Sequence, residues 1–337
     1  MSTRELPAGI AELSKAELHV HLEGSVRPAI AATLAKRHGI TLTEADVQQR
    51  YAYTNFNQFI DAFKWVTSFL REPADFALIA SDFAQQLIAQ NVTYAEVTLS
   101  VGVMLLRHQN PQANFEAILA ATEPFESKGL RLNWIFDAVR QFGPDRAAEV
   151  VDWAKLCHSP RIVAFGIGGD ELQVETKQFR RVYARAAEAG LRGLMHAGEV
   201  GGPEKIREAI ELLGVERVGH GIAAFRDPAL MDVLAERRIV LEVCPASNFR
   251  TGALAAQLRN PEPAIRDHPL PQFVRHGIAV VLSTDDPSMF HTSLREEYAH
   301  AHAMGLRDSE LAQLVENGFT FSFLARQERH KLHFRPA

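Results

Sequence analysis

The sequence has few cysteines, no long apolar run and no excess of basic residues. Its 337 residues include only two cysteines, Cys157 and Cys244, too few for a disulfide framework or a Cys-x-x-Cys metal clip. We therefore expect any metal to be held by histidine and carboxylate side chains. No apolar stretch approaches the roughly 20 residues of a membrane span, and the net charge of −5 does not point to nucleic acid.

The first residues, Met1–Gly9, lack the basic head and apolar core of a secretory leader. The sequence therefore predicts a cytoplasmic protein that binds neither membrane nor nucleic acid. Its length and its 47 % hydrophobic content allow one large globular unit or two small ones.

Short apolar or β-branched runs recur along the chain, and stretches with helical spacing separate them. A strand followed by a helix, eight times over, is the pattern of a parallel (β/α)8 TIM barrel, an α/β fold of about 250 residues. We therefore expect residues 1–337 to form a single barrel domain. The predicted helices include Thr176–Ala189, Glu204–Leu213 and Pro228–Arg237. The eight predicted strands are Glu17–Leu22, Thr93–Leu99, Arg131–Ala138, Ile162–Gly168, Gly193–His196, Arg217–His220, Ile239–Val243 and Ala279–Ser283.

The residues in excess of a minimal barrel fit a helical insertion at 26–90, between the first two strands. This segment contains at least two helical patterns and no convincing strand. Two interpretations stay open, a helix packed on the barrel and a flap over the mouth of a pocket, because the loops after barrel strands build the catalytic face. Its apolar stripe consists of Phe56, Phe59, Ile60, Phe63, Val66 and Phe69.

Two further segments are predicted from composition. The stretch Arg259–Pro271, which contains proline and asparagine, is predicted to be a long loop before the last strand. The polar segment Arg326–Ala337 is predicted to be peripheral.

Residues suited to chemistry follow strand after strand at the C-terminal end. In a parallel barrel these ends converge on one pocket, so the residues are expected to share a site. At or just after the strand ends, they are His19 and His21 for the first strand, Gly169 for the fourth, His196 and Glu199 for the fifth, His220 for the sixth, and Asp285 and Asp286 for the eighth.

The pair His19 and His21 lies in an apolar run where strand alternation would point both imidazoles the same way. Imidazole and carboxylate are ligands of catalytic Zn²⁺, and a site with one position left for water can carry out hydrolysis. A second His-x-His, His300 and His302, lies in the predicted helix Leu294–Met304, where residues two apart do not face each other. We assign that second pair a structural role.

The other strand ends add acid and base candidates. His196 is followed three residues later by Glu199, which an apolar pocket can keep protonated for use as a general acid. His220 lies between two glycines, which leaves room for a substrate or a water molecule. Of the neighbours Asp285 and Asp286, one can ligate a metal while the other hydrogen-bonds the nucleophilic water.

Six motifs together resemble the adenosine deaminase family of the amidohydrolase superfamily, over nearly the whole chain and in the family's order. The other zinc deaminases hold their metal with thiolates of a Pro-Cys-x-x-Cys motif, which is missing around Cys244. The six motifs are Lys-Ala-Glu-Leu-His-Val-His-Leu-Glu-Gly at 15–24, Gly-Gly-Asp-Glu at 168–171, His-Ala-Gly-Glu at 196–199, Val-Gly-His-Gly at 218–221, Cys-Pro-Ala-Ser-Asn at 244–248 and Ser-Thr-Asp-Asp-Pro at 283–287.

The resemblance implies one zinc ion per chain and a hydrolytic deaminase that converts a 6-aminopurine to a 6-oxopurine and ammonia. Glu199 would donate a proton to ring N1, His220 and Asp286 would orient or deprotonate the attacking water, and the backbone of Gly169 would meet the purine at N3. Asn248 is expected to shape its loop without a chemical role. The zinc would be held by His19, His21, His196 and Asp285.

Two departures from the family pattern concern the substrate. Where adenosine deaminases have an Asp that reaches the ribose 5′-hydroxyl, this chain has Glu23; and the strand-four run, usually Asp-Leu-Ala-Gly-Asp-Glu, here begins with Gly166. We expect an adenosine-type nucleoside, with Glu23, His21 and Asp286 near it. A 5′-phosphate is disfavoured because Glu23 would repel it unless Arg27 or Lys64 intervenes.

Other substrates stay open. Family relatives act on adenine, N6-methyl-AMP or aminodeoxyfutalosine, a nucleoside with a benzoate-containing 5′ extension. A catalytically inactive purine-binding protein of the same fold is the alternative from another class. The intact set of Glu199, His220 and Asp286 favours the enzyme, because a binder would not need all three.

Overall fold

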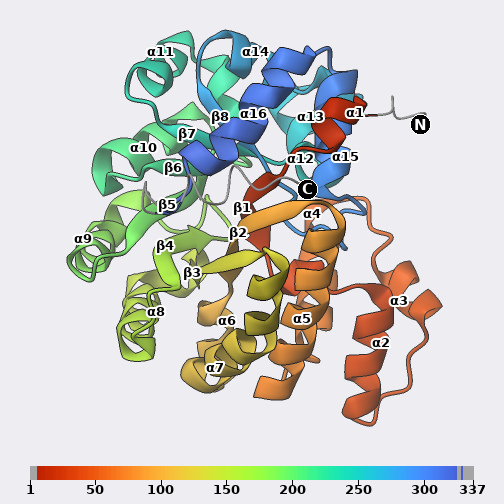
Figure 1. Cartoon of the computed structure of the whole chain (residues 1–337). Coiled ribbons are helices and arrows are strands. Elements are labelled where there is room, and N and C mark those ends of the chain that lie inside the picture. Colours follow the sequence, from red (N-terminus) through yellow and green to blue (C-terminus); the bar gives the residue numbers. More distant parts are fainter. Residues whose placement is uncertain (1–5, 325–327, 329–337) are drawn as a thin grey trace.

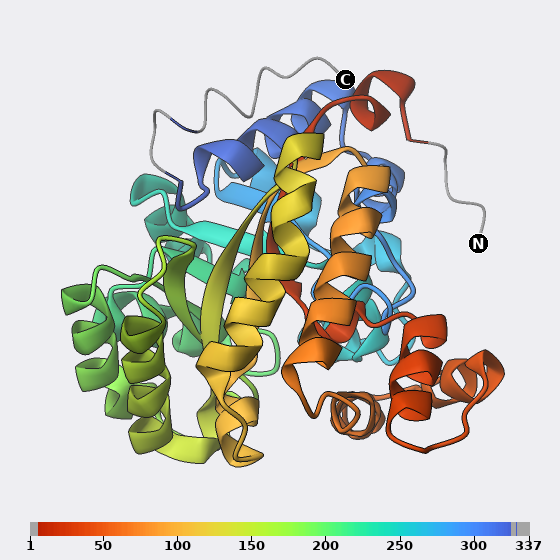
Figure 2. The ribbon, with the colours of Figure 1, turned by 60° about the horizontal axis from the view of Figure 1, so that its bottom comes forward.

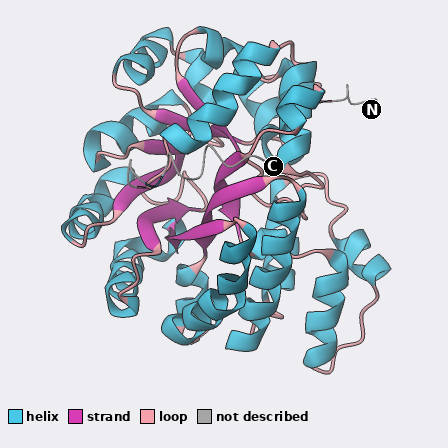
Figure 3. Cartoon of the chain, viewed as in Figure 1, coloured by secondary structure: helices cyan, strands magenta, loops and turns pink. Residues whose placement is uncertain are grey.

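The computed structural model describes residues 6–324 and residue 328. Eight parallel strands follow one another around a barrel in the order β1 to β8, with helices outside them (Figures 1 and 3). The predicted (β/α)8 barrel is confirmed, and every strand lies within two residues of its predicted bounds. The strands are β1 Lys15–His21, β2 Val92–Leu99, β3 Arg131–Val139, β4 Ile162–Gly168, β5 Arg192–Ala197, β6 Arg217–His220, β7 Val240–Val243 and β8 Ala279–Leu282.

The helices form the outer ring and the insertion. The predicted helices of this ring are found, the first of them divided into a 3-10 turn, η4, and α9. The α-helices are α1 Ala8–Ala11, α2 Pro28–Arg37, α3 Glu44–Arg50, α4 Phe56–Thr67, α5 Pro73–Ala89, α6 Val101–Leu106, α7 Pro111–Thr122, α8 Gly143–Cys157, α9 Arg180–Glu188, α10 Pro203–Leu213, α11 Pro228–Glu236, α12 Pro245–Arg250, α13 Ala253–Leu258, α14 Leu270–Arg275, α15 Leu294–Ala303 and α16 Asp308–Thr320. The 3-10 helices are η1 Glu23–Ser25, η2 Glu123–Lys128, η3 Arg140–Phe142, η4 Thr176–Phe179, η5 Ile222–Arg226 and η6 Ile265–Asp267.

The barrel strands are buried on both faces, as expected for a parallel sheet covered by helices. Six of the seven residues of β1 are buried, and all of β6 and β7. The first and eighth strands meet at a bridge between Val20 and Asp285, where His21 N–H donates to Asp285 O at 2.7 Å and Asp285 N–H donates to His19 O at 3.0 Å. Backbone hydrogen bonds therefore join the His-x-His motif of β1 directly to the Asp-Asp pair that follows β8.

Helices α2–α5 fill the predicted insertion between β1 and β2. In Figure 2 they are the red to orange helices on one side of the barrel. Helix α5 packs against α7 in the outer ring, whereas Phe56, Phe59, Ile60 and Phe63 of α4 line a cavity at the C-terminal end of the strands. The insertion thus contributes both to the ring and to the cavity wall.

The predicted loop Arg259–Pro271 is correct only in part. It holds the short η6, and α14 already begins at Leu270. Pro271 lies in the first turn of that helix, where a backbone N–H has no hydrogen-bond partner within the helix. Proline therefore costs no hydrogen bond there, and it lies at the start of a helix although it suggested a loop.

Three remaining expectations concern the C-terminal segment, the cysteines and membrane spans. The segment Arg326–Ala337 lies outside the described residues except for Glu328. Both cysteines are free thiols. No helix in the described part of the chain is long and apolar enough to cross a membrane.

Candidate active site and metal centre

The described residues include one group of buried side chains whose ligand atoms all lie within 4.8 Å of one another, His19, His196, His220 and Asp285. Each comes from the C-terminal end of a different strand, or from the residues just after it: β1, β5, β6 and β8. All four are less than 10 % exposed. Three imidazoles and a carboxylate in one buried cluster match the ligand chemistry of a divalent metal such as zinc.

The buried nitrogen His19 Nε2 supports the fit. It has no hydrogen-bond partner among the described residues and lies 3.5 Å from Asp285 Oδ1. A buried polar atom without a partner is costly unless something else satisfies it. A cation held between His19 and Asp285 would do so.

His21, a ligand in the sequence prediction, lies at the edge of this group. Its Nε2 is 3.3 Å from Asp285 Oδ1, and it lines the cavity. His220, predicted to act on the water, lies inside the group, with Nε2 3.9 Å from Asp285 Oδ2. The five side chains therefore cluster around Asp285, and which three histidines bind the metal stays a prediction.

Two members of the group have unusual backbone conformations. His220 has φ = 60° and Asp285 has φ = 65°, in the left-handed region that side chains other than glycine seldom adopt. Such conformations persist when the surrounding structure determines them, and they gather at functional sites. Here they turn the chain sharply at the ends of β6 and β8, where both side chains join the cluster.

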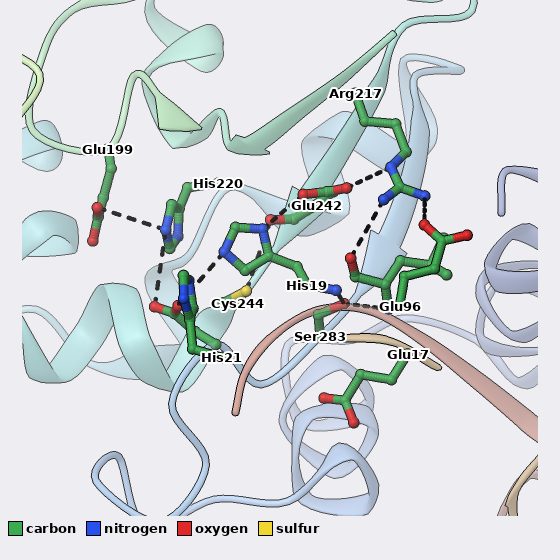
Figure 4. A network of polar contacts seen from close by, with 12 residues as sticks. Glu17, His19, His21, Glu96, Glu199, Arg217, His220, Glu242, Cys244 and Ser283 are labelled. Atoms are coloured by element: carbon green, nitrogen blue, oxygen red, sulfur yellow. Dashed lines mark hydrogen bonds and ion pairs between the residues drawn. The ribbon is translucent and has the colours of Figure 1, made fainter. Parts of the chain in front are cut away.

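A buried network behind the cluster holds His19 (Figure 4). Glu242 Oε2 lies 2.6 Å from His19 Nδ1, and its other oxygen lies 2.6 Å from Arg217 Nε. Arg217 also pairs with Glu96 at 2.6 Å. A carboxylate on the second nitrogen of a metal-binding histidine fixes the ring and its tautomer. Sequence reasoning missed Glu242, although a lone carboxylate inside the apolar strand Val240–Val243 was a usable signal.

The Cys-Pro-Ala-Ser-Asn motif supplies two more contacts. Ser247 Oγ donates to Asp285 Oδ2 at 2.7 Å. Asn248 Nδ2 lies 3.1 Å from His220 Nδ1. Asn248 was expected only to shape its loop, and the structure places it against a catalytic candidate.

Burial lowers the pKa of three of these histidines and so favours their neutral form. Desolvation lowers the pKa of His21 and of His220 to about 4, and it holds the pKa of His196 well below its usual value. His19 is different, because the nearby carboxylates of Asp285 and Glu242 outweigh desolvation and raise its pKa to about 10. Neutral imidazoles have a lone pair for a metal, and binding at His19 would release a proton.

Glu199 has the electrostatics of a general acid. Burial, and after it the Asp285 carboxylate, raises the pKa of Glu199 well above its usual range. The side chain lines the cavity with Oε2 3.6 Å from His220 Nε2. The raised pKa favours the protonated form of Glu199, and its side chain faces the space where a substrate would lie.

The turn that carries Glu199 is held by Glu171 from the Gly-Gly-Asp-Glu motif. The Glu171 carboxylate accepts the backbone N–H groups of Gly198, Glu199 and Val200 at 2.6, 2.8 and 2.9 Å. The sequence prediction gave Glu171 no role, since the contact depends on how the loops after β4 and β5 meet.

Asp286 is buried and lines the cavity, and its Oδ1 has no partner among the described residues. Burial and the neighbouring Asp285 raise its pKa well above the usual range. Gly24 packs against it so closely that a Cβ there would lie 1.8 Å from Asp286 Oδ1. The glycine after the His-x-His-Leu-Glu run therefore makes room for Asp286.

Glu23 was predicted to contact the substrate, but it is absent from the described residues that line the cavity. Its Oε1 accepts the Ser100 N–H at 2.9 Å and its side chain is only 3 % exposed, with burial raising its pKa to about 7. Ser100 itself lines the cavity. Glu23 thus lies one layer behind the wall.

The cavity has a volume of about 580 Å³ and opens above the histidine cluster. Gly169, with φ = 97°, lines it, and a Cβ there would lie 2.4 Å from Gln141 Oε1. Two cations, Lys64 and Arg107, lie on the wall formed by α4 and α6. The apolar part of that wall consists of Phe56, Phe59, Ile60, Phe63, Val103 and Leu106.

The second His-x-His pair is distant from this chemistry. His300 and His302 lie on α15 and belong neither to the cavity lining nor to the metal group within the described ranges. Their predicted structural role is consistent with this placement.

The chain is similar to known deaminases over most of its length. The family model named adenosine deaminase matches residues 14–335. An aminodeoxyfutalosine deaminase of Streptomyces coelicolor is 39 % identical, over 95 % of this chain and 83 % of the relative.

Solved structures agree with the sequence relatives. The crystal structure of an adenine deaminase from Arthrobacter aurescens superposes with a TM-score of 0.88 at 29 % identity, covering 95 % of this chain and 97 % of the other. An amidohydrolase from Burkholderia ambifaria with bound Zn superposes with a TM-score of 0.87 at 25 % identity, covering 98 % and 92 %. With the histidine and aspartate cluster at the strand ends and a family match across the barrel, this chain belongs to the adenosine deaminase family and is a deaminase.

Proposed function

We propose that the protein is a zinc-dependent hydrolytic deaminase of a 5′-extended 6-aminopurine nucleoside, with aminodeoxyfutalosine as the first candidate. The observation that carries the proposal is the cavity, which joins the metal group and Glu199 to a long apolar and cationic wall. The most similar named relative reported above acts, by its name, on that nucleoside.

Zinc would be held by His19, His21, His196 and Asp285, as one ion per chain. The zinc-bound Burkholderia structure supports this choice of metal. Bound there, zinc would lower the pKa of a water molecule so that a nucleophile is available at neutral pH.

The chain's own residues account for the proton transfers. Glu199, kept protonated by burial, donates to purine N1 and makes C6 more electrophilic. His220, a member of the group whose lowered pKa favours the neutral form, accepts a proton from the attacking water, and Asp286 orients that water. Gly169, which has no side chain to obstruct the base, offers its backbone to N3. The proton on His220 then passes to the amino group, the bond between C6 and that nitrogen breaks and ammonia leaves, while the C6 hydroxyl returns a proton to Glu199 and the 6-oxopurine remains.

The wall of the cavity fits the 5′ extension better than it fits an unmodified ribose. Phe59 and Phe63 of α4 can pack against an aromatic ring. Lys64 and Arg107 can pair with a carboxylate on that ring. We also propose that the insertion 26–90, through α4, covers the bound substrate within the single domain 1–337.

Adenine is the second candidate. Glu23, the counterpart of the residue that would reach a ribose hydroxyl, is buried behind Ser100. A site without that contact fits a free base, and the Arthrobacter relative is named for adenine. Plain adenosine, first in the sequence prediction, has less support than either.

The test is ammonia release by the zinc-loaded protein from a panel of adenine, adenosine, 5′-deoxy-5′-methylthioadenosine, aminodeoxyfutalosine and AMP. We expect the largest kcat/KM for aminodeoxyfutalosine. Phe63→Ala should then raise KM for it and leave turnover of adenine unchanged. Reaction of adenine alone would select the second candidate, and no ammonia from any of the five would refute the deaminase.

Glu199→Gln tests the mechanism separately from the substrate. It should keep the zinc and lose about 10²- to 10⁴-fold in kcat, because the amide cannot donate the same proton. Glu204→Gln is the matched control, since Glu204 is exposed in the first turn of the following helix, α10, and bonds only the nearby Gly202 N–H among the contacts described. An unaffected Glu199→Gln would overturn the assignment.

A further inference from the structure

The second ring nitrogens of the clustered histidines do not all have partners. His19 Nδ1 lies 2.6 Å from Glu242, and His220 Nδ1 lies 3.1 Å from Asn248. His196 Nδ1 is buried without a hydrogen-bond partner in the described part of the chain. Metal-binding histidines almost always donate this second N–H to a carboxylate, a carbonyl or water, so His196 is the exception.

Asp137, on β3, has a carboxyl group close to the unpartnered nitrogen of His196. It is 4 % exposed and lines the cavity, and its Oδ1 also has no partner among the described residues. A Cβ built on Gly168 would lie 3.4 Å from His196 Nδ1 and 3.5 Å from Asp137 Oδ2. The unpartnered nitrogen and the carboxyl group therefore border the same point at the end of β4.

The strand register explains why the carboxyl group comes from β3. Asp137 is paired with Gly166 of β4. A Cβ on Gly166 would lie 3.1 Å from Asp137 Oδ1, so the Asp137 side chain fills the space that a side chain at 166 would enter. Position 166 is also where the sequence departs from the family pattern by having glycine.

We propose that Asp137 is the positioning residue of His196, and that it takes the place of a carboxylate on the neighbouring strand. In the zinc-loaded protein Asp137 accepts the N–H of His196 Nδ1, which fixes the tautomer and leaves the other nitrogen for the metal. This inference rests on the metal site of the proposed function.

The test measures zinc affinity by competition with a chromogenic chelator, and the visible spectrum of the cobalt-substituted protein. Asp137→Ala should bind zinc about 10- to 100-fold more weakly, with an altered cobalt spectrum. The exchange variant Asp137→Gly/Gly166→Asp returns a carboxyl group from the adjacent strand and should recover most of the affinity. Gly166→Asp alone should not improve affinity, because two carboxyl groups would crowd one space.

Asn133→Ala is the matched control. Asn133 is on the same strand four residues earlier, is buried, and donates to the Tyr94 hydroxyl, so its loss tests stability without touching His196. It should leave zinc affinity unchanged. Wild-type affinity and spectrum in Asp137→Ala would overturn the inference, as would an exchange variant no better than Asp137→Ala. A wild-type protein that binds no zinc would instead refute the proposed function.

Discussion

The Glu171 carboxylate accepts the backbone N–H of Glu199 at 2.8 Å and also accepts the N–H groups of Gly198 and Val200, so it fixes the turn that carries Glu199. One carboxylate of the loop after β4 thus positions the proposed general acid in the loop after β5.

Glu171→Gln should lower kcat/KM by about 10- to 100-fold while zinc content stays at the wild-type level. An amide has only one acceptor oxygen for three N–H groups, and a small displacement of a catalytic group is costly. Steady-state kinetics and metal analysis check this. Asp170→Asn, at the half-buried neighbour in the same motif, should behave like wild type. Equal losses in the two variants would contradict the role of Glu171.

Glu242→Gln should weaken zinc binding by about 10- to 100-fold, because His19 Nδ1 loses its charged acceptor at 2.6 Å. Glu96→Gln is a close control, since Glu96 is the other buried carboxylate on Arg217. Both variants disturb the arginine and should lower the melting temperature. Chelator competition should detect a metal defect only in Glu242→Gln, and a defect shared by both would assign the effect to Arg217.

The sequence was sufficient for the barrel and for the residues at its strand ends. Each strand is a short apolar run, and a residue at or just beyond its C-terminal end, such as His196 or Asp285, has its place fixed by the topology. Residues such as Glu242 and Asp137 lie inside the strands, and their partners come from strands elsewhere in the barrel. Their roles depend on which side chains face each other across its interior, which local patterns do not encode.

The same reason explains the two placements that differ from expectation. Glu23 has the right position in its motif to reach a substrate, yet its side chain turns to Ser100 N–H and is buried. His220 belongs to the metal group and His21 does not, and the backbone at His220 is left-handed.

Gly24→Ala should abolish most activity and keep the zinc. The added methyl group would lie 1.8 Å from Asp286 Oδ1, and its three nearest atoms all belong to Asp286, so this carboxylate, which we propose orients the water, must move. We expect a loss of about 10²-fold or more in kcat. Gly9→Ala serves as the control, because a Cβ there meets nothing within 4 Å. Normal kinetics in Gly24→Ala would show that Asp286 is not needed where it lies.

Glu297→Gln should change how stability depends on pH. Glu297 is fully buried on α15, and its carboxyl group contacts the Thr292 hydroxyl and the Ala246 N–H. Burial raises its pKa from 4.5 to about 8. Between these values the folded protein binds more protons here than the unfolded chain, so this group's contribution to stability declines as pH rises and is lost above pH 8.

Glutamine keeps both contacts and cannot ionise, so the variant should gain stability relative to wild type as pH rises from about 5 to about 8. Urea unfolding of the zinc-loaded proteins at several pH values measures this difference. Glu296→Gln, at the exposed neighbour on the same helix, should follow the wild-type curve. Parallel curves for Glu297→Gln and wild type would mean that Glu297 ionises equally in the folded and unfolded chains, and that its burial does not hold the proton.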